Sequence, residues 1–442
     1  MYPLPTQVNT ALTLLNEAGF EAFVVGGAVR DLLRGSHVHD WDITTSALPE
    51  QTKAVFAGCR LIETGIKHGT VTVLMDGFPL EITTYRTEGT YSDHRRPDSV
   101  FFTRSLEEDL ARRDLTVNAM AYHPHTGVVD PFGGQADLHA RIIRCVGDPD
   151  KRFQEDALRM LRALRFASRL GFSIEPETAA AIHKNRELLT HVAAERIREE
   201  LTGLLCGGCV ESILRQYHDV LAIPIPELAP LTGFKQYNCH HCHDVWGHTI
   251  AAVAAAPDLP VLRWAALLHD TGKPDRFFRS EDGVGHFYGH AEESAKITAV
   301  VTARLRFDNA TRDTVCFLTE HHHLFLDISE KTVKKAVLRF GKDKLKLLLW
   351  LLRADTLGHS PCCFHHLDDI RRLEQLISVV PEFTVKDLAV NGSDLLALGY
   401  KGPQIGQTLA SLVDAIFLNG LENRKDVLLS YLAEHPGTQE EP

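Results

Sequence analysis

Two carboxylates and a glycine pair near the N-terminus have types and spacing suited to phosphoryl transfer. Gly26 and Gly27 follow a short apolar run, and Asp40 and Asp42 come next in the chain. Glycines let a backbone approach a triphosphate closely, and the N-terminus of a following helix offers free N–H groups to it. Aspartates two apart on a strand point to the same face, so this pair could hold two divalent cations. Glu81, on a later expected strand, is a candidate third carboxylate.

A second set of residues, in the C-terminal half, has the character of metal ligands. Imidazole and carboxylate suit a transition metal that activates water near neutral pH. An isolated His-Asp pair also suits a helix cap, and the run from His321 to His323 leaves the choice among three neighbours open. The histidine-rich region 240–360 includes His248, His269, Asp270, His290, His321 and Asp355.

The elements that must position these residues change in character along the chain. In the N-terminal third, segments with the apolar spacing of a helix alternate with short apolar runs typical of strands. This pattern predicts a small mixed α/β unit. From Asp156 onward the patterns are almost entirely helical. The expected strands are 23–25, 40–45, 71–75 and 80–85. The expected helices are 6–19, 28–33, 177–187, 194–206, 248–256, 261–269, 291–305, 331–339, 343–353, 366–378 and 403–419.

Length and composition set the outer limits. A chain of 442 residues is long enough for two to four domains. No apolar run reaches the roughly 20 residues that span a bilayer, and the first residues lack the pattern of a signal peptide. The sequence therefore predicts a cytoplasmic protein without a membrane segment. The net charge of −11 neither excludes RNA nor identifies it, because affinity depends on a local cationic face.

The nine cysteines are expected to be free thiols. Cys206 and Cys209, and Cys239 and Cys242, have the two-residue spacing of zinc ligands, and two such pairs could close a tetrahedron. The first pair encloses two glycines at a helix end, and the second lies in a histidine-rich turn. Ordinary cysteines are therefore the favoured interpretation.

Six ordered motifs lie between Phe23 and about Leu204. They are Val24-Val25-Gly26-Gly27-x-Val29-Arg30-Asp31, Asp40-Trp41-Asp42-Ile43-Thr44-Thr45, Arg112-Arg113-Asp114-x-Thr116-x-Asn118-Ala119-Met120, Asp130-Pro131-x-Gly133-Gly134, Glu155-Asp156-x-x-Arg159 and Glu195-Arg196-Ile197-x-x-Glu199-Glu200. With these motifs the chain resembles the bacterial (class II) tRNA nucleotidyltransferases and the related poly(A) polymerases of the polymerase-β superfamily. The resemblance implies an α+β fold, in which a small polymerase-β-like head precedes an all-helical neck, body and tail, placed at 1–140, 141–225, 226–375 and 376–442.

The resemblance also implies roles for individual residues. Asp40, Asp42 and Glu81 would be catalytic, with Mg²⁺ held by the two aspartates. Asp114 with Arg113 would recognise the ribose hydroxyl, which both donates and accepts a hydrogen bond. An exposed ion cluster is the alternative. The expected nucleotide-binding residues are Gly26, Gly27, Arg30, Arg112, Arg113, Asp114, Asn118, Glu155, Asp156 and Arg159.

Base selection is expected from Asp156 and Arg159. Aspartate can accept from the exocyclic amine of cytosine or adenine, and arginine can donate to the adjacent ring atom. Glu155 would orient Arg159. On one helix these spacings also suit an ion pair worth about 0.3–0.5 kcal/mol. The segment from Arg86 to Pro97 resembles the family loop that switches the pocket from C to A, although a basic loop touching phosphate is an alternative.

Residues 240–360 resemble the HD phosphohydrolase superfamily. This implies a metal at His248, His269, Asp270 and Asp355, with Mn²⁺, Ni²⁺ or Co²⁺ as candidates, and a second metal or phosphate at His290 and His321. Hydrolysis of phosphomonoesters or 2′,3′-cyclic phosphates would follow. The tail from Gly399 to Gly406 resembles a tRNA-holding segment.

The expected function is addition of C, C and A to tRNA from CTP and ATP, by a monomer or a homodimer. A poly(A) polymerase is one alternative, although the acidic C-terminal end counts against it. An enzyme adding only CC or only A is another. A metal phosphohydrolase with a nucleotide-binding regulatory half is the alternative of a different class.

Overall fold

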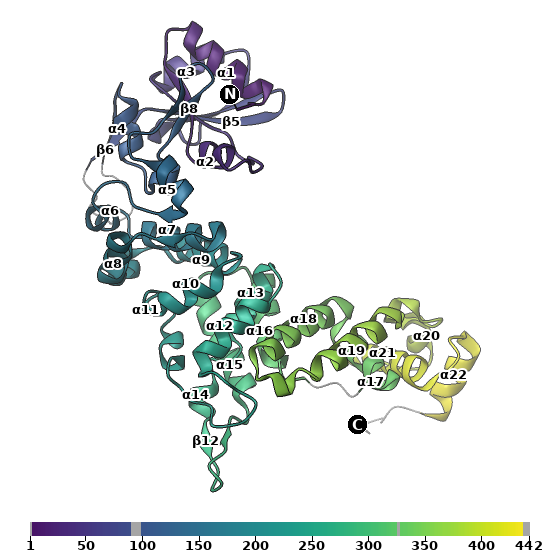
Figure 1. Ribbon diagram of the computed structural model, residues 1–442. Helices are drawn as coiled ribbons and strands as arrows, with labels where there is room; N and C mark the ends of the chain where they lie inside the picture. The colour runs from purple at the N-terminus through teal and green to yellow at the C-terminus, as the bar shows by residue number, and fades with distance from the viewer. Residues whose placement is uncertain (1, 90–98, 325–327, 436–442) are drawn as a thin grey trace. The chain divides into compact units, whose positions relative to one another are not determined.

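The computed structural model describes residues 2–89, 99–324 and 328–435. The chain forms two compact units, one of Met1–Thr232 with Val300–Asp308 and one of Gly233–Ala299 with Asn309–Pro442. Within the described residues the first unit carries a seven-stranded sheet, whereas the second is helical apart from one short hairpin. The expected α+β fold, with a sheet-containing head and a helical remainder, is confirmed (Figure 1).

The sheet is mixed and places the candidate carboxylates near its centre. Only β2 and β5 pair in parallel among its strands, and the other pairs are antiparallel. In this register Val25 pairs with Asp42, and Asp42 pairs with Glu81. The strand order is β3 (Arg60–Ile62), β4 (Thr70–Met75), β5 (Phe78–Thr84), β2 (Asp42–Thr45), β1 (Ala22–Val25), β8 (Ala121–His123) and β9 (Gly127–Val129).

A continuous apolar core fixes this sheet. Val24 and Ile43 are fully buried on neighbouring strands, and Leu12 and Leu15 of α1 (Thr6–Glu17) belong to the same cluster. The apolar face of α1 recurs at helical spacing, which is why the segment folds as an amphipathic helix. Helices α1 and α3 (Pro49–Val55) contact each other and the sheet, and α2 (Gly27–Leu33) follows β1 directly (Figure 1).

The rest of the first unit is mainly helical. It also holds the paired strands β6 (Arg86–Glu88) with β7 (Val100–Phe102), and β10 (Ile142–Ile143) with β11 (Ser173–Ile174). Helix α7 contacts α9, and buried leucines of both helices fill the space between them. The helices are α4 (Leu106–Ala111), α5 (Gly134–Ala140), α6 (Pro149–Glu155), α7 (Leu158–Leu170), α8 (Pro176–Asn185), α9 (Ala194–Leu205), α10 (Val210–Gln216) and α11 (His218–Leu221).

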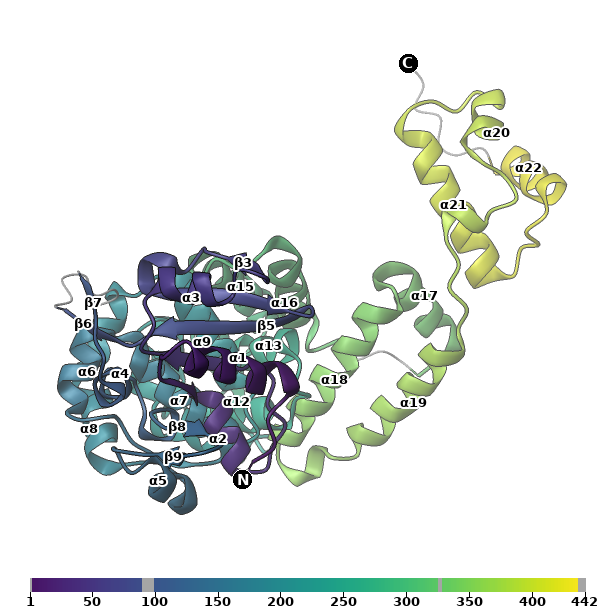
Figure 2. The same ribbon diagram turned by 90° about the horizontal axis from the view of Figure 1, so that it is seen from above.

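The second unit is built around α12 and α18, which contact each other extensively. Helix α19 packs along α18, and α20 to α22 enclose a small core of their own (Figure 2). Strands β12 (Phe278–Arg279) and β13 (Gly285–His286) form the hairpin. The helices are α12 (Val245–Ala255), α13 (Pro260–Leu268), α14 (Lys273–Arg276), α15 (His290–Arg304), which ends in the first unit, α16 (Asn309–His321), α17 (Glu330–Phe340), α18 (Lys342–Gly358), α19 (His366–Val379), α20 (Gly392–Ala397), α21 (Pro403–Asn419) and α22 (Lys425–Glu434).

Two local predictions from the sequence are wrong. The strand expected over 40–45 begins at Asp42, so Asp40 precedes it. The helix expected to carry Glu155, Asp156 and Arg159 is broken, because Asp156 has extended backbone angles between α6 and α7. Its carboxylate accepts a hydrogen bond from the N–H of Leu158, as a residue at the start of a helix does.

Most of the segment expected to switch the pocket from C to A, Arg86 to Pro97, lies outside the described residues. Its first residues, Arg86–Glu88, form β6. Among the helices of the described ranges, none combines the length and the apolar character needed to cross a bilayer.

Candidate active sites

The turn after β1 leaves room for charged side chains. Gly26 has φ of 70°, a conformation that favours glycine. A Cβ at this position would lie 3.2 Å from Arg113 Nη1 and 3.9 Å from Asp42 Oδ2. The absence of a side chain therefore keeps a guanidinium and a carboxylate accessible at the end of β1.

Three carboxylates gather beside this turn. Asp42 begins β2, its register partner Glu81 lies on β5, and Asp40 precedes the strand. Burial raises the pKa of Asp42, and the charges of Glu81 and Asp40 raise it further, while Arg113 acts in the opposite direction. A divalent cation would offset this repulsion, and carboxylate oxygens are the ligands that Mg²⁺ prefers. These residues therefore fit a divalent cation.

Asp109 organises the two arginines that precede Asp114. Its carboxylate is fully buried and accepts from Arg112 Nε at 2.9 Å and from Arg113 Nη2 at 3.4 Å. Thr44 Oγ1 on β2 donates to the same carboxylate at 3.1 Å. Asp109 is not among the residues predicted from the sequence, although it lies three and four residues before the two arginines, a spacing typical of helical ion pairs.

Asp114 pairs with Arg162 rather than with Arg113, the partner expected from the sequence. Arg162 Nε on α7 donates to Asp114 Oδ2 at 2.7 Å, and the N–H of Leu115 donates to Oδ1 at 2.9 Å. Burial alone would raise the pKa of Asp114, but the Arg162 guanidinium outweighs it and holds the pKa below its ordinary value. Asp114 is therefore an oriented acceptor that remains ionised.

Arg30 positions Asn118. Its Nη1 donates to Asn118 Oδ1 at 2.7 Å, and its other nitrogens donate to both oxygens of Asp31 at 3.0 and 2.8 Å. The guanidinium also lies over the Phe166 ring, 5.1 Å from its centroid. With its oxygen occupied, the Asn118 side chain presents its NH₂ group to an acceptor.

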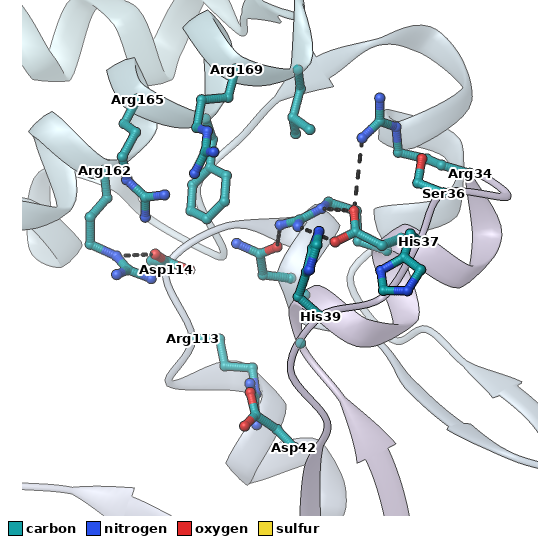
Figure 3. Close-up of a pocket in the computed structure, with 17 residues that line it drawn as sticks. Arg34, Ser36, His37, His39, Asp42, Arg113, Asp114, Arg162, Arg165 and Arg169 are labelled. Carbon is teal, nitrogen blue, oxygen red and sulfur yellow. Dashed lines mark hydrogen bonds and ion pairs between the residues drawn. The ribbon is translucent and has the colours of Figure 1, made fainter. Parts of the chain in front are cut away.

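Several of these residues line a pocket of about 510 Å³ in the first unit. Figure 3 shows Arg162, Arg165 and Arg169 projecting from one helix, with Asp42 and Arg113 close together at the opposite end. Arg113 Nε is buried and has no hydrogen-bond partner among the described residues. The lining includes the expected residues Gly26, Gly27, Arg30, Asp42, Arg113, Asp114 and Asn118, and the unexpected residues Arg34, Ser36, His37, His39, Arg162, Arg165, Phe166 and Arg169.

The candidate base-selecting residues do not line this pocket. Arg159 is buried, and its Nη1 donates to Glu155 Oε2 at 2.6 Å, so the expected orienting pair is present. Asp156 pairs with Arg196 of α9, whose Nη2 lies 2.9 Å from Oδ2. Arg112, Asp40 and Glu81 are also absent from the lining.

The second unit brings His248, His269, Asp270 and Asp355 together in its interior. Their side chains are buried, and the ligand atoms of the two histidines and two aspartates lie 2.8–3.4 Å apart in the measured pairs. Ligand atoms bound about 2.0–2.2 Å from one ion, at right or tetrahedral angles, lie roughly 2.8–3.6 Å apart. The spacing therefore matches ligands arranged around a common cation.

Asp270 joins this group to a second one. Its Oδ2 faces His248 and His269, while its Oδ1 lies 3.4 Å from His290 Nε2 and 3.7 Å from His322 Nε2. Both oxygens are buried, and neither accepts a well-aligned hydrogen bond from a described residue, although Lys273 Nζ lies 2.7 Å from Oδ2. A buried carboxylate in this condition fits a metal ligand, because a bound cation would satisfy its oxygens.

The histidine rings are oriented for metal binding. Nδ1 of each of four histidines lies 2.7–3.0 Å from a backbone carbonyl, which fixes the proton on that nitrogen. Nε2 then points toward the centre, where it would give its lone pair to a bound cation, as in histidines that bind metals. The four are His248, His269, His290 and His322.

His322 occupies the position that the sequence analysis assigned to His321. The His321 ring stacks on Phe317, 4.6 Å between centroids, and Nδ1 lies 2.9 Å from the Phe317 carbonyl oxygen. His322 and His323, by contrast, form a ligand group with His290. Helix α16 ends at His321, so the His321 side chain still belongs to the helix. His322 and His323 follow the helix end, and their rings approach His290.

The two aspartates of this centre remain ionised. Burial alone would raise their pKa values, but His269 and Lys273 beside Asp270, and His248 and His269 beside Asp355, hold both pKa values well below the ordinary value. A neighbouring pocket of about 530 Å³ is lined by His290, His323, His241, Lys273, Phe287 and Tyr288, among others. A phosphate ester could enter there beside the second group.

Known proteins match the chain in the same order as these sites. Family models match the poly A polymerase head domain over residues 22–144, a probable RNA and SrmB-binding site of polymerase A over 171–231, and the HD domain over 240–357. The CCA-adding enzyme of Geobacillus thermodenitrificans is 37% identical over 450 residues, covering 100% of this chain and 99% of that protein. The chain belongs to the family of CCA-adding enzymes.

Further comparisons agree with this membership. The CCA-adding enzyme of Levilactobacillus brevis is 38% identical over 439 residues, covering 98% of this chain and 99% of that protein. The crystal structure of the Bacillus stearothermophilus CCA-adding enzyme in complex with CTP is 31% identical, with a TM-score of 0.76 and coverage of 99% and 98%. The expected resemblance to tRNA nucleotidyltransferases, with an HD domain in the second half, is confirmed.

Proposed function

We propose that this CCA-adding family member adds C, C and A in turn to the 3′ end of tRNA, using CTP and ATP without a nucleic-acid template. The observation that carries the proposal is the pocket of the first unit, in which a glycine turn, Asp42 and a row of arginines meet. Near-complete coverage by relatives named CCA-adding enzymes supports it, and so does the structure of one such relative with CTP.

The pocket suits a nucleoside triphosphate. Arginines bind phosphate oxygens through paired donors, and Arg162, Arg165 and Arg169 provide a cationic row along α7. Asp40, Asp42 and Glu81 would hold Mg²⁺, which when bound neutralises phosphate charge during in-line transfer. Asn118 would donate its NH₂ group to a phosphate oxygen.

Ribose selection would come from Asp114. Its ionised carboxylate can accept from the 2′-hydroxyl, and the neighbouring guanidinium of Arg162 can donate to the same hydroxyl. A 2′-deoxyribose would offer no such hydroxyl to this pair, and a site built around a hydroxyl rejects an analogue that lacks it.

Base selection would come from Asp156 and Arg159, as the family resemblance implies. The orientation of each is fixed, Arg159 by Glu155 and Asp156 by Arg196. An oriented acceptor beside an oriented donor complements cytosine and adenine, whereas uracil and guanine present the opposite order at those positions. One pair of side chains could thus serve both CTP and ATP.

The direct test is to incubate tRNA lacking its last three nucleotides with each nucleoside triphosphate singly and in combination, and to size the products. We expect two additions with CTP alone, a third only when ATP is present, and none with UTP or GTP. A ladder of many adenylates would identify a poly(A) polymerase, and products stopping at CC with both substrates would identify a partial enzyme.

A second candidate activity is favoured by the HD centre. We propose that its residues would hold transition metal, with His248, His269, Asp270 and Asp355 in one group and His290 and His322 in the second, and that the site hydrolyses a phosphomonoester or a 2′,3′-cyclic phosphate. The metal ions, when bound, would polarise the phosphate and activate water. Lys273 lies beside Asp270 and lines the adjacent pocket, where it could neutralise the phosphate.

The aromatic rim of that pocket favours a nucleotide as substrate. Tyr288 is 73% exposed, and its ring stacks with that of His286 at an interplanar angle of 17°. An exposed stack of this kind offers a face to a base. Phosphate release from nucleoside monophosphates and opening of 2′,3′-cyclic nucleotides, with manganese, nickel, cobalt or magnesium, would test this activity. No turnover with any of the four would contradict it.

A further inference from the structure

A cluster of sulfur and imidazole groups near the HD centre shares no residue with the ligand groups of either candidate active site. His240 precedes α12, and Cys362 and Cys363 belong to the turn η5 (Pro361–Cys363) after α18. Their ligand atoms all lie within 4.8 Å of one another. The distance from Cys363 Sγ is 3.5 Å to His240 Nδ1 and 3.9 Å to Cys362 Sγ.

These distances match a tetrahedral zinc site. With Zn–S bonds of about 2.3 Å and Zn–N bonds of about 2.0–2.1 Å, tetrahedral angles separate two sulfurs by roughly 3.8 Å and sulfur from nitrogen by roughly 3.6 Å. The two measured separations lie close to these values. A disulfide would require the sulfurs to be about 2.05 Å apart, so the cluster has the spacing of ligands and not of a bridge.

The backbone holds the two segments in this position. The N–H of Ser360 donates to the carbonyl oxygen of His240 at 2.8 Å, and the Cys362 thiol donates to the carbonyl oxygen of Cys239 at 3.7 Å. Cys363 is 6% exposed, so one sulfur is fixed in the interior while its neighbours face outward. The three side chains therefore meet because the fold places them together.

We propose that His240, Cys362 and Cys363 bind a zinc ion through one imidazole nitrogen and two thiolates. Soft thiolate ligands select zinc over magnesium, manganese and calcium, which prefer oxygen. Cys239, whose carbonyl oxygen accepts from the Cys362 thiol, is the adjacent cysteine that could supply the fourth ligand. The two-residue spacings in the sequence did not reveal this cluster, because the structure combines His240 with a Cys-Cys pair more than a hundred residues later.

The zinc ion would fasten the segment before α12 to the turn after α18. The adjoining helices carry ligands of the HD centre, His248 on α12 and Asp355 on α18. His248 Nδ1 lies 3.0 Å from the carbonyl oxygen of Gly358, at the end of α18. The zinc site would thus act as a structural clamp beside the HD centre, separate from its catalytic ions.

Zinc content and a cobalt spectrum test the proposal on the full chain. Zinc per chain should fall by one in Cys362→Ser/Cys363→Ser relative to the parent, and should not change in Cys206→Ser/Cys209→Ser, which removes the same number of thiols elsewhere. Metal-free protein titrated with Co²⁺ should show near-ultraviolet sulfur-to-cobalt charge transfer. The HD ligands contain no sulfur and cannot produce that absorption.

The absence of charge transfer in the parent would overturn the proposal, as would its persistence in Cys362→Ser/Cys363→Ser. Should the double variant fail to fold, the single variant Cys362→Ser at the exposed position replaces it, and the absorption should fall below that of the parent at equal cobalt. Equal absorption in Cys362→Ser and the parent would contradict the assignment.

Discussion

The transfer pocket and the HD centre present metal ligands in opposite ways. Asp40 and Glu81 are exposed and, with Asp42, offer only oxygen, whereas His248, His269 and Asp270 are at most 1% exposed and are mainly nitrogen donors. Oxygen ligands at an open site suit a cation that enters and leaves with each triphosphate. Buried imidazoles suit a resident transition metal.

The difference extends to the charge that each region must balance. Burial raises the pKa of Asp42, and the charges of Glu81 and Asp40 raise it further, so a bound cation would stabilise the ionised carboxylate beyond what Arg113 supplies. At the HD centre, Lys273 and the histidines already keep Asp270 and Asp355 ionised. The two sites therefore stabilise their ionised carboxylates differently. The transfer pocket needs a cation that arrives with its substrate, whereas the HD centre relies largely on cationic side chains of the fold.

The largest expected effect is on nucleotide addition in Asp42→Ala. Loss of this carboxylate opens the cation site, and we expect a fall of roughly 10³-fold in the rate of CTP incorporation. Circular dichroism and phosphohydrolase activity should match the parent, since the two ligand sets share no residue. Addition at a tenth of the parent rate by the folded variant would show that the assignment is wrong.

A somewhat smaller effect is expected from His269→Ala. The first group loses a nitrogen ligand, so phosphate release should fall by more than about 100-fold, whereas nucleotide addition should stay within a few-fold of the parent. His321→Ala is the matched control, because His321 lies at the same pocket but outside the ligand groups. A parallel loss of both activities in His269→Ala would instead show that the sites are coupled.

A change of specificity, and not of rate, is expected from Asp156→Ala. A hydrogen bond to a charged group is worth about 1.5–3 kcal/mol, so discrimination against UTP should fall by roughly 10–100-fold. The control Asp156→Asn keeps an oxygen that can accept from the N–H of Leu158 and so preserves the start of α7. A variant that loses thermal stability but keeps strict choice of C and then A would support a purely structural ion pair.

The smallest expected effect concerns stability. The pKa of Asp42 is raised in the folded chain from its ordinary value of 3.8, so its ionisation opposes folding. The penalty is absent below about pH 3.8 and is complete above the folded pKa. Asp42→Asn should therefore raise Tm at pH 7 in chelator, by a few degrees if the penalty is about 1 kcal/mol.

The matched condition for that stability measurement is added Mg²⁺. The parent should gain Tm with the cation more than Asp42→Asn does, because only the parent retains the full ligand set. A Tm for Asp42→Asn that is equal to or below the parent value in chelator would contradict the proposed repulsion among the three carboxylates.

The sequence predicted the elements around these sites well because their signals are local. Gly26 after an apolar strand, and the apolar periodicity of the long helices, depend on neighbours only a few residues away. The broken helix at Asp156 was missed because its partner Arg196 lies 40 residues later and stabilises an extended backbone that helix spacing does not reveal.

The sequence predicted site partners less well. Arg162 replaces Arg113 beside Asp114, and His322 replaces His321 beside His290. In both cases the sequence predicted the type of residue correctly but not its position in the chain. The rotation of a helix about its axis, and the residue at which it ends, decide which of several similar side chains faces the site. The cluster of His240, Cys362 and Cys363 could not be predicted from the sequence, because the packing of α12 against α18 brings its two segments together.

The most direct test of two chemically distinct centres is selective restoration of metal in one preparation. The chain is stripped with chelator, dialysed, and divided between Mg²⁺ alone and Mg²⁺ with Mn²⁺, Ni²⁺ or Co²⁺. CCA addition and release of phosphate from a nucleoside monophosphate are then measured side by side. We expect Mg²⁺ alone to restore addition while phosphate release stays at background, and a transition metal to restore the release. Recovery of both activities with Mg²⁺ alone, or of neither without a transition metal, would contradict the account.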